Sequence, residues 1–369
     1  MASTISNEVT IYMPSLGGGG AEKSVIRLIG GFTKRGIKVT LVLATPHGNL
    51  HYEIPSQVNI ITFNSNRSIY SVFKFARYIK KNNPQIIISF LSRGNRNALL
   101  AKLLTMNNTR LYVVEQNTIS MGLKNSSFIN RYLSLLSFKF LYYYADKIIN
   151  VSKSASDDLS KLLPKNNNSV ITIHNPIVDK SMISEEKDEP PHKWLKSKDI
   201  PVILGVGRFM EQKDFINLIR AFVLVKKHRS ARLIILGEGE QRKIIEEEIR
   251  KHNLEDSVDL PGFVRDPFKY MRNASLFALS SKWEGLPTVL VEALACGCPV
   301  VSTNCPSGPM EILENGKYGE LVPIQNSPAL ADAIIKTLSD PPSKELLRKR
   351  AMEFSIENSV DKYIKLLEI

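Results

Sequence analysis

Residues 282–301 read KWEGLPTVLVEALACGCPVV, and the rest of the chain is best interpreted outward from this stretch. A loop containing Glu284 leads through Pro287 into an apolar segment of helical character, because proline suits the first turn of a helix. Glu292 follows inside that helix, eight residues after Glu284. The start of such a helix offers free N–H groups and a partial positive charge, and together these bind anions.

Two carboxylates beside an anion site would repel the anion, so we expect them to accept hydrogen bonds from hydroxyl groups on either side of it. A nucleotide sugar has this layout, since its pyrophosphate lies between sugar hydroxyls and ribose hydroxyls. A capped helix with two surface acids is the competing interpretation of the same spacing.

Upstream, a predicted strand over residues 201–206 leads into GRFMEQKD (207–214), which places Arg208 and Lys213 in one loop. Arginine offers a bidentate fork to a pyrophosphate, and lysine offers a point charge. If the bond between a sugar and a phosphate breaks, such cations stabilise the charge that grows on the leaving group. Solvated loop charges are the alternative interpretation of this pair.

Predicted strands and helices alternate with short connections through both halves of the chain, which indicates an α/β fold with parallel, doubly wound sheets. In the first half, a predicted strand over Val9–Pro14 precedes the glycines Gly17–Gly20 and a helical pattern, an arrangement that can cradle phosphate. Ligands of such sheets bind beyond the carboxyl ends of the strands. We therefore expect Gly17–Gly20, Ser89–Arg93 and Glu115–Thr118 at one edge.

The chain of 369 residues, with 43% hydrophobic and 23% charged residues, is long enough for two globular cores. The acidic, proline-containing stretch EEKDEPPHKW (185–194) separates the halves, so we expect domains over residues 1–178 and 179–345. An amphipathic pattern over Lys344–Leu367 predicts a last helix, and residues 346–369 are expected to pack across both domains.

Charge is unevenly distributed: residues 1–178 hold 21 Lys and Arg against 7 Asp and Glu, although the whole chain carries only +13. This asymmetry indicates an anionic partner for the first half, namely a membrane surface, a phosphorylated acceptor or nucleic acid. Residues 123–144 predict a Tyr-, Phe- and Leu-rich helix with Lys124, Arg131 and Lys139. That helix fits either a membrane interface or a place against the sheet.

The sequence contains no apolar run of membrane-spanning length and no signal-peptide pattern, so we expect a cytoplasmic chain, peripheral on the inner face of the cell membrane. Cys296, Cys298 and Cys305 lie within ten residues of one another without a nearby histidine. Small buried thiols are therefore expected here rather than a metal site.

The segments GGGGAEK, GVGRFMEQKD, GEGE, LPGFVRDP and above all WEGLPTVLVEALACGCPVVSTNCPSGPMEIL resemble the retaining glycosyltransferases of family four. The similarity extends over nearly the whole chain. It implies the GT-B fold, in which two doubly wound Rossmann-like domains face each other across a cleft. It also implies transfer of a hexose or N-acetylhexosamine from a nucleotide sugar, with UDP as the expected nucleotide, to a lipid-linked saccharide or growing surface-polysaccharide precursor such as that of lipopolysaccharide.

The resemblance assigns side-chain roles only where this sequence matches the motifs of the family. Arg208 and Lys213 would hold the pyrophosphate of the donor. Glu284 would contact the hydroxyls of the transferred sugar, and Glu292 those of the ribose.

Backbone groups are assigned in the same way. The N–H groups of Leu286, Thr288 and Val289 would face the phosphates, and Gly20 would face the distal phosphate. The backbone of Val264 would contact the edge of the base.

On the acceptor side the sequence departs from the family, which often has a histidine after the strand corresponding to Leu111–Val114. Here that position is Gln116, which still donates hydrogen bonds, and Glu115 and Gln116 are expected on the acceptor side. The chain has no Asp-x-Asp triplet, and the fold of the family does not require a metal, so we expect neither metal nor cofactor. In the retaining reaction, the departing phosphate itself takes the proton of the acceptor hydroxyl.

Two other functions remain as alternatives. A nucleotide-sugar isomerase or hydrolase of the same architecture would need an acid/base group in the first half, where His47, His51 and His174 match no convincing site. A non-enzymatic anion-binding protein fits the positive charge. Because the basic residues are spread over many elements, we expect no nucleic-acid partner.

Overall fold

The computed structural model describes residues 7–17, 19–46, 51–65, 68–116, 138–163, 170–183, 189–197 and 199–369. The chain divides into two compact units. The first contains Met1–Pro176 together with Ile356–Ile369, and the second contains Ile177–Ser355. The first unit therefore includes the last residues of the chain.

The first unit is built on a parallel seven-stranded sheet with the order β3-β2-β1-β4-β5-β6-β7. Its strands are β1 (Glu8–Met13), β2 (Lys38–Leu43), β3 (Asn59–Thr62), β4 (Ile86–Phe90), β5 (Arg110–Glu115), β6 (Lys147–Asn150) and β7 (Val170–Thr172). The central strand β4 is buried at all of its residues, as expected for a parallel sheet that is covered on both faces.

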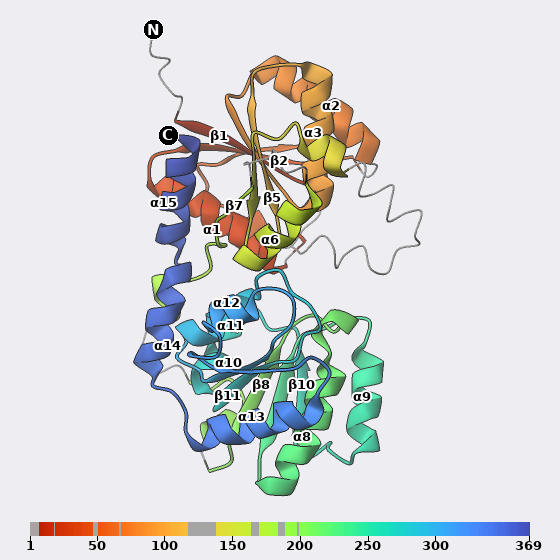
Figure 1. Ribbon diagram of the computed structural model, residues 1–369, viewed down its shortest axis with the longest axis vertical. Coiled ribbons are helices and arrows are strands. Elements are labelled where there is room, and N and C mark those ends of the chain that lie inside the picture. The colour runs from red at the N-terminus through yellow and green to blue at the C-terminus, as the bar shows by residue number, and fades with distance from the viewer. Residues whose placement is uncertain are drawn as a thin grey trace. The chain divides into compact units, whose positions relative to one another are not determined.

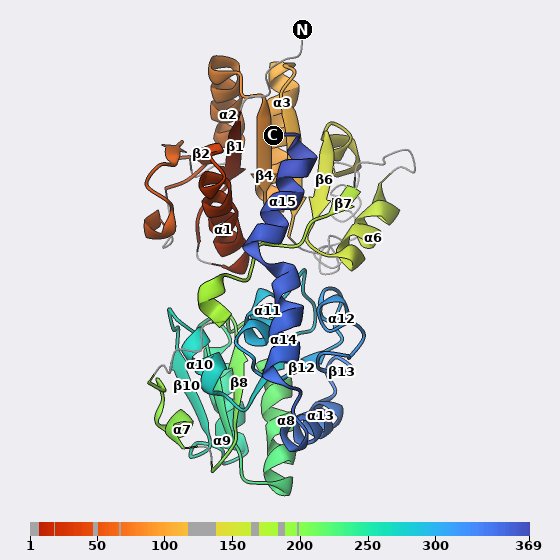
Figure 2. The same ribbon diagram turned by 90° about the vertical axis from the view of Figure 1, so that its left-hand side faces the viewer.

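Helices cover both faces of this sheet, with α1 and α15 on one face and α2 and α3 on the other (Figure 1, Figure 2). The helices of the first unit are α1 (Gly20–Lys34), η1 (His51–Glu53), α2 (Ser68–Asn82), α3 (Ser92–Thr105), α6 (Lys153–Leu162) and α15 (Ile356–Leu367). Residues 138–142 are also helical. Tyr142 and Leu159 join residues of α2 and α3 in one buried apolar cluster, so these segments pack on the same face.

The second unit has a parallel six-stranded sheet with the order β10-β9-β8-β11-β12-β13. Its strands are β8 (Val202–Val206), β9 (Arg232–Leu236), β10 (Val258–Gly262), β11 (Leu276–Leu279), β12 (Val300–Thr303) and β13 (Glu320–Val322). The first strand of each unit, β1 in the first sheet and β8 in the second, lies near the centre of its sheet. The strand order therefore reverses beside it, as in doubly wound folds.

The main helices of the second unit are α8 (Phe215–His228), α9 (Arg242–Lys251), α10 (Phe268–Asn273), α11 (Thr288–Ala295), α12 (Pro309–Ile312), α13 (Ser327–Ser339) and α14 (Lys344–Ala351). Shorter turns are η2 (Lys180–Ile183), α7 (Lys193–Lys196), η3 (Glu211–Lys213) and η4 (Met352–Phe354). Residues of α8, α9 and α13 form one buried cluster with the sheet. Figure 1 shows α10, α11 and α14 on the opposite face.

The predicted α/β architecture with a parallel, doubly wound sheet in each half is confirmed. The prediction of a single helix over Lys344–Leu367 is wrong. That segment forms α14 and α15, because η4 and the extended residue Ser355 (φ −67°, ψ 157°) interrupt the helical path.

Part of the predicted helix over residues 123–144 falls outside the described residues, and so do Lys124, Arg131 and His47. Lys139 is described and exposed. Within the described ranges, no helix is both long enough and apolar enough to cross a membrane.

Candidate active site

Loops that follow β8, β11 and β12 are joined to one another at the carboxyl edge of the second sheet. The N–H of Lys282 donates to the carbonyl oxygen of Gln212 at 2.8 Å, and the N–H of Glu284 donates to that of Pro306 at 2.7 Å. The Ser280 hydroxyl also donates to the carbonyl oxygen of Lys213 at 2.7 Å. These bonds fix the loop that contains Glu284 against the loop that contains Lys213.

Lys213 and Glu284 form an ion pair, with Nζ 2.6 Å from Oε1, and their side chains are only 15% and 8% exposed. The Ser281 hydroxyl donates to the same oxygen at 2.7 Å, and Gln212 Nε2 lies 3.4 Å from Oε2. The carboxylate therefore holds the ammonium group in one place. A lysine has three N–H donors and this pair uses one of them, which leaves donors for a phosphate.

The loop after β8 places Arg208 and Lys213 in different environments. A Cβ atom on Gly207 would lie 3.1 Å from Cε of Lys213, so glycine allows the lysine stem to run close along the loop. Arg208 is exposed, and among the described residues its guanidinium has no ion-pair partner. Because Lys213 is neutralised by Glu284, Arg208 supplies the uncompensated positive charge of this loop.

The N-terminus of α11 follows directly after Glu284. Pro287 precedes the helix, and no side chain caps it. The N–H groups of its first turn, including those of Thr288 and Val289, have no carbonyl partner inside the helix, so they are available to an anion. Leu286 is buried before this turn, and Glu292 is buried on the second turn.

At the carboxyl edge of the first sheet, Glu115 is completely buried and receives three side-chain hydrogen bonds. Ser92 Oγ donates to Oε2 at 2.7 Å, Asn95 Nδ2 donates to Oε1 at 2.8 Å, and the Tyr142 hydroxyl also donates to Oε1. Burial raises the pKa of Glu115, while the three donors act in the opposite direction. The carboxyl group therefore organises its neighbours and is enclosed by them.

Gln116 forms a reciprocal amide pair with Asn175. Gln116 Nε2 donates to Asn175 Oδ1 at 3.2 Å, and Asn175 Nδ2 donates to Gln116 Oε1 at 2.7 Å. Sequence reasoning did not select Asn175, which lies three residues after the end of β7. Asn95 and Tyr142 were missed as well, whereas Ser92 lies within the predicted edge segment Ser89–Arg93.

The remaining predicted positions lie at the carboxyl edges of their own sheets. Gly20 is the exposed first residue of α1, which follows β1. Val264 is half-buried and follows β10. Gly20, Glu115 and Gln116 belong to the first unit, and the other predicted site residues belong to the second.

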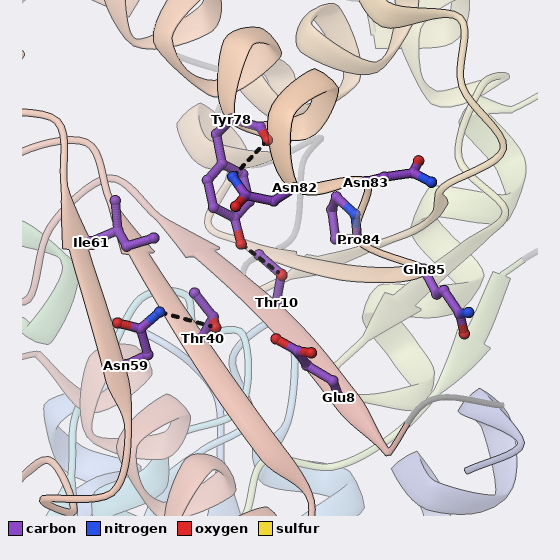
Figure 3. A pocket seen from close by; sticks show the side chains of 10 residues that line it. All are labelled: Glu8, Thr10, Thr40, Asn59, Ile61, Tyr78, Asn82, Asn83, Pro84 and Gln85. Carbon is purple, nitrogen blue, oxygen red and sulfur yellow. Dashed lines mark hydrogen bonds between the residues drawn. The ribbon is translucent and has the colours of Figure 1, made fainter.

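A pocket of about 400 Å³ opens at the opposite, amino edge of the first sheet (Figure 3). Its lining includes Glu8 at the start of β1 and Asn82 at the end of α2. Thr10 Oγ1 and the Tyr78 hydroxyl lie 3.2 Å apart within it. This pocket contains none of the predicted site residues.

The three cysteines are buried, as predicted. Burial raises the pKa of Cys296 and of Cys305 to about 12, and it raises the pKa of Cys298 as well. The thiols are therefore protonated and unreactive near neutral pH. Within the described part of the chain, no three His, Cys, Asp or Glu residues are grouped so that they would hold a metal ion.

Two family models match the chain. The model described as "Glycosyltransferase Family 4" matches residues 18–180, and the model described as "Glycosyl transferases group 1" matches residues 186–354. The chain is 32% identical over 354 residues to the N-acetylgalactosamine-N,N'-diacetylbacillosaminyl-diphospho-undecaprenol 4-alpha-N-acetylgalactosaminyltransferase of Campylobacter jejuni, covering 92% of this chain and 93% of that one. It is 30% identical over 340 residues to an uncharacterised glycosyltransferase of Methanocaldococcus jannaschii, covering 80% and 82%.

Solved structures with the same fold include HepE of Anabaena in complex with UDP, with a TM-score of 0.78, 20% identity and coverage of 98% of this chain and 99% of that one. The sucrose-phosphate synthase of Thermosynechococcus elongatus has a TM-score of 0.80, 20% identity and coverage of 98% of both chains. At this identity the likeness extends to the fold alone.

Proposed function

Because the chain belongs to the family four glycosyltransferases with the GT-B fold, we propose that it transfers a hexose or N-acetylhexosamine from a UDP-sugar, with retention of configuration, to a lipid-linked saccharide or growing polysaccharide precursor. The family and the transferase class are thus as predicted. The donor, the stereochemistry and the acceptor are the proposal.

The observation that carries this proposal is the buried ion pair between Lys213 and Glu284 beside the uncapped start of α11. The pair places a cation, which can bind a phosphate, beside a carboxylate, which can accept hydrogen bonds from hydroxyl groups. A sugar that is bound through its phosphate requires both groups close together. Lys213 and Arg208 stabilise the charge on the leaving nucleoside diphosphate, together with the first N–H groups of α11. Glu284 accepts hydrogen bonds from the transferred sugar.

The remaining donor contacts are assigned on the second unit. Glu292 accepts hydrogen bonds from the ribose, and the N–H groups of Leu286, Thr288 and Val289 face the phosphates. The backbone of Val264 contacts the base. On the first unit, Gly20 faces the distal phosphate.

The acceptor side is proposed at the carboxyl edge of the first sheet. Glu115 orients Asn95, Ser92 and Tyr142 through its three hydrogen bonds. Gln116, held by Asn175, presents its remaining N–H to an acceptor hydroxyl. Because Glu115 is enclosed, it is a poor candidate for a general base, which favours proton transfer to the departing phosphate.

The names of similar proteins support the proposed donor and the proposed acceptor. The Campylobacter relative is named for transfer to a saccharide on diphospho-undecaprenol, and the HepE structure contains UDP. We therefore propose a lipid diphosphate acceptor that is reached from the inner face of the cell membrane, without a metal or cofactor. The anionic leaflet would attract the excess of basic residues in the first half.

A panel of UDP- and GDP-sugars tests the proposal, first by thermal stabilisation and then by transfer to polyprenyl-diphosphate saccharides with and without EDTA. We expect stabilisation by one UDP-sugar, EDTA-resistant transfer and an anomeric configuration that matches the donor. Release of free sugar at the same rate without an acceptor would instead favour the isomerase or hydrolase alternative. Inversion at the anomeric carbon would rule out the retaining mechanism.

Steady-state kinetics distinguishes the proposed roles of Glu284 and Glu292. Glu284→Gln is expected to reduce kcat, because its partner hydroxyls belong to the sugar that is transferred, whereas Glu292→Gln is expected to raise the KM for the donor through the ribose. The reverse pattern would exchange the two assignments.

A further inference from the structure

A long part of the first unit presents no exposed negative side chain. Between Glu53 and Asp146 the chain contains twelve Lys and Arg residues and a single acid, Glu115. Glu115 is completely buried. This part of the sequence includes α2, α3 and the helical residues 138–142, so the exposed charges on these three segments are all positive.

These segments form one layer over the same face of the first sheet. Leu99 of α3 and Tyr142 belong to one buried cluster with residues of α2, and α2 packs along α3, as Figure 1 and Figure 2 show. The end of the layer is fixed by an ion pair in which Lys102 Nζ of α3 lies 2.6 Å from Asp146 Oδ2. The sides of the segments that face away from the sheet therefore form a common surface.

The outward surface exposes large apolar side chains where α3 ends beside the segment that precedes β6. Six of them, which we call the α3 patch, have exposed fractions between 37% and 92%: Leu100, Leu104, Met106, Phe140, Tyr143 and Tyr144. The ring centroid of Tyr144 lies 5.5 Å from that of Phe140 and 5.5 Å from that of Tyr143, so the rings are clustered. Exposed aromatic and aliphatic groups in such a cluster mark an interaction surface.

Exposed lysines lie on the same layer, namely Lys80 and Lys81 at the end of α2 and Lys139 beside Phe140. Protein interfaces are depleted in lysine, whereas the boundary of a bilayer accepts aromatic and aliphatic side chains with lysines around them. Apart from Asp146, whose carboxylate is paired with Lys102, the described part of this layer carries positive charge without exposed acids, which makes it complementary to anionic lipid.

We propose that the α3 patch is the surface through which the first unit binds an anionic lipid bilayer, with the apolar side chains in the interface and Lys80, Lys81 and Lys139 at the lipid phosphates. The inference deepens the proposed function, because a lipid-linked acceptor requires an enzyme at the bilayer surface. It assigns the contact to described residues alone.

Co-sedimentation of the full-length protein with vesicles tests this inference, using phosphatidylcholine vesicles with and without phosphatidylglycerol and no sugar substrate. The test variant is Leu104→Ser/Met106→Ser/Tyr143→Ser. The matched control is Tyr52→Ser, because Tyr52 and Tyr143 are both 71% exposed and both belong to the first unit. We expect the protein to bind only vesicles that contain the anionic lipid. The triple variant should bind these vesicles more weakly by a factor on the order of ten, and the control variant should bind them as the unmodified protein does.

Salt and oligomeric state complete the test. Binding is expected to weaken in 0.5 M NaCl, where charges are screened beyond about 4 Å. Equal vesicle binding by the triple variant, or no binding by the unmodified protein, would overturn the proposal. So would a dimer that the triple variant converts to a monomer, because the patch would then contact a second copy.

Two further measurements separate this inference from the proposed function. The triple variant should retain the thermal unfolding of the unmodified protein and full transfer to a water-soluble, short-chain acceptor. If no sugar is transferred by any form of the protein but vesicle binding depends on the α3 patch, the proposed function fails and the docking surface stands.

Discussion

The ion pair of Lys213 with Glu284 fixes an ammonium group that would otherwise sample many rotamers. A buried lysine loses much side-chain conformational entropy when it becomes ordered. The 2.6 Å contact with the carboxylate offsets this loss. The same contact cancels the charge of the lysine. Under the proposed function, Arg208 would then be the source of net attraction for a diphosphate, and Lys213 would act at a fixed distance from the bond that breaks.

Replacing either cation tests these separate roles. Lys213→Ala and Arg208→Ala are each expected to lower kcat about a hundredfold or more, since loss of one group that stabilises a developing anion costs roughly 3 kcal/mol of barrier. Initial rates at saturating donor measure this effect. Lys282→Ala is the control, because Lys282 is in the adjoining loop and pairs with Glu211 at 3.1 Å. Near-normal turnover in either test variant would contradict the phosphate assignment.

Glu115 makes a pH-dependent contribution to stability. Burial raises its pKa above the ordinary value of 4.5, so ionisation is less favourable in the folded protein than in the unfolded chain. Below pH 4.5 the carboxyl group is neutral in both states and carries no penalty. As the pH rises through the elevated pKa, the folded state loses stability relative to the unfolded state.

We therefore expect Glu115→Gln to gain stability relative to the unmodified protein as the pH rises from 5 to 8, by about 1.4 kcal/mol for each unit of pKa shift. Thermal unfolding followed by circular dichroism at several pH values measures the difference. Glu248→Gln is the control and should show a nearly constant difference from pH 5 to 8, because Arg220 lowers the pKa of Glu248 and the stability that depends on its ionisation is lost only below pH 4.5. A difference that does not change with pH would exclude a raised pKa at Glu115.

Sequence reasoning identified candidate residues at the carboxyl ends of strands, such as Glu115, and in the loops that follow strands, such as Lys213 and Glu284. It missed Tyr142 and Asn175, because each meets its partner across a large separation in sequence. Those contacts depend on the order of strands in the sheet and on the packing of residues 138–142, and no local pattern specifies either.

At the scale of elements, the packing of α15 on α1 depends on one glycine. A Cβ atom on Gly31 would lie 2.3 Å from Cγ2 of Val360, whereas a Cβ on the neighbouring Gly30 would meet nothing within 4 Å. Both glycines are inside the same helix, so each destabilises the helix to a similar extent relative to alanine. Only Gly31 is required by the approach of the second helix.

Gly31→Ala is therefore expected to destabilise the first unit by about 1–3 kcal/mol through overpacking. Gly30→Ala is the control and should be stabilising by roughly 0.5–1 kcal/mol, since alanine is the better helix former. In a Val360→Ala background, which removes the clashing methyl groups, Gly31→Ala should no longer destabilise. Denaturant titration of the four proteins measures these differences, and equal destabilisation by both glycine variants would refute the packing argument.

Element boundaries could be predicted where a short apolar run is bounded by polar or glycine residues, as for β1 and β8, which were predicted over Val9–Pro14 and residues 201–206. They were missed where signals are weak or spread out. α6 (KSASDDLSKL) is rich in Ser and Asp, which compete with helical hydrogen bonds, and its start depends on Ser152 accepting from the N–H of Ala155. The break between α14 and α15 was missed because the amphipathic pattern continues through η4.

At the scale of the whole molecule, the chain returns to its first unit at the end. The helix α15 buries Val360, Tyr363 and Leu367 in that unit. Arg35 Nη1 also lies 2.8 Å from Asp361 Oδ1, but this pair is about half-exposed. The apolar contacts therefore dominate. Sequence patterns predicted an amphipathic last helix that packs across both domains, but they did not identify the residues that it contacts.

Removing residues 356–369 is expected to unfold the first unit selectively. Burial of three large side chains contributes roughly 5 kcal/mol, which is comparable to the entire stability of many domains. Both tryptophans of the chain, Trp194 and Trp283, lie in the second unit. The truncated protein should thus lose part of its far-ultraviolet circular dichroism, while the thermal transition seen by tryptophan emission persists.

Asp361→Ala is the control for this truncation, because it removes only the exposed ion pair and should leave both signals nearly unchanged. Coincident loss of both signals on truncation would mean that the second unit also depends on α15. Unchanged circular dichroism would mean that the first unit folds without α15. Partial loss of circular dichroism without a change in tryptophan emission requires instead that the last segment of the chain completes the first unit. In that case the first unit reaches its full stability only after synthesis of the second unit is finished.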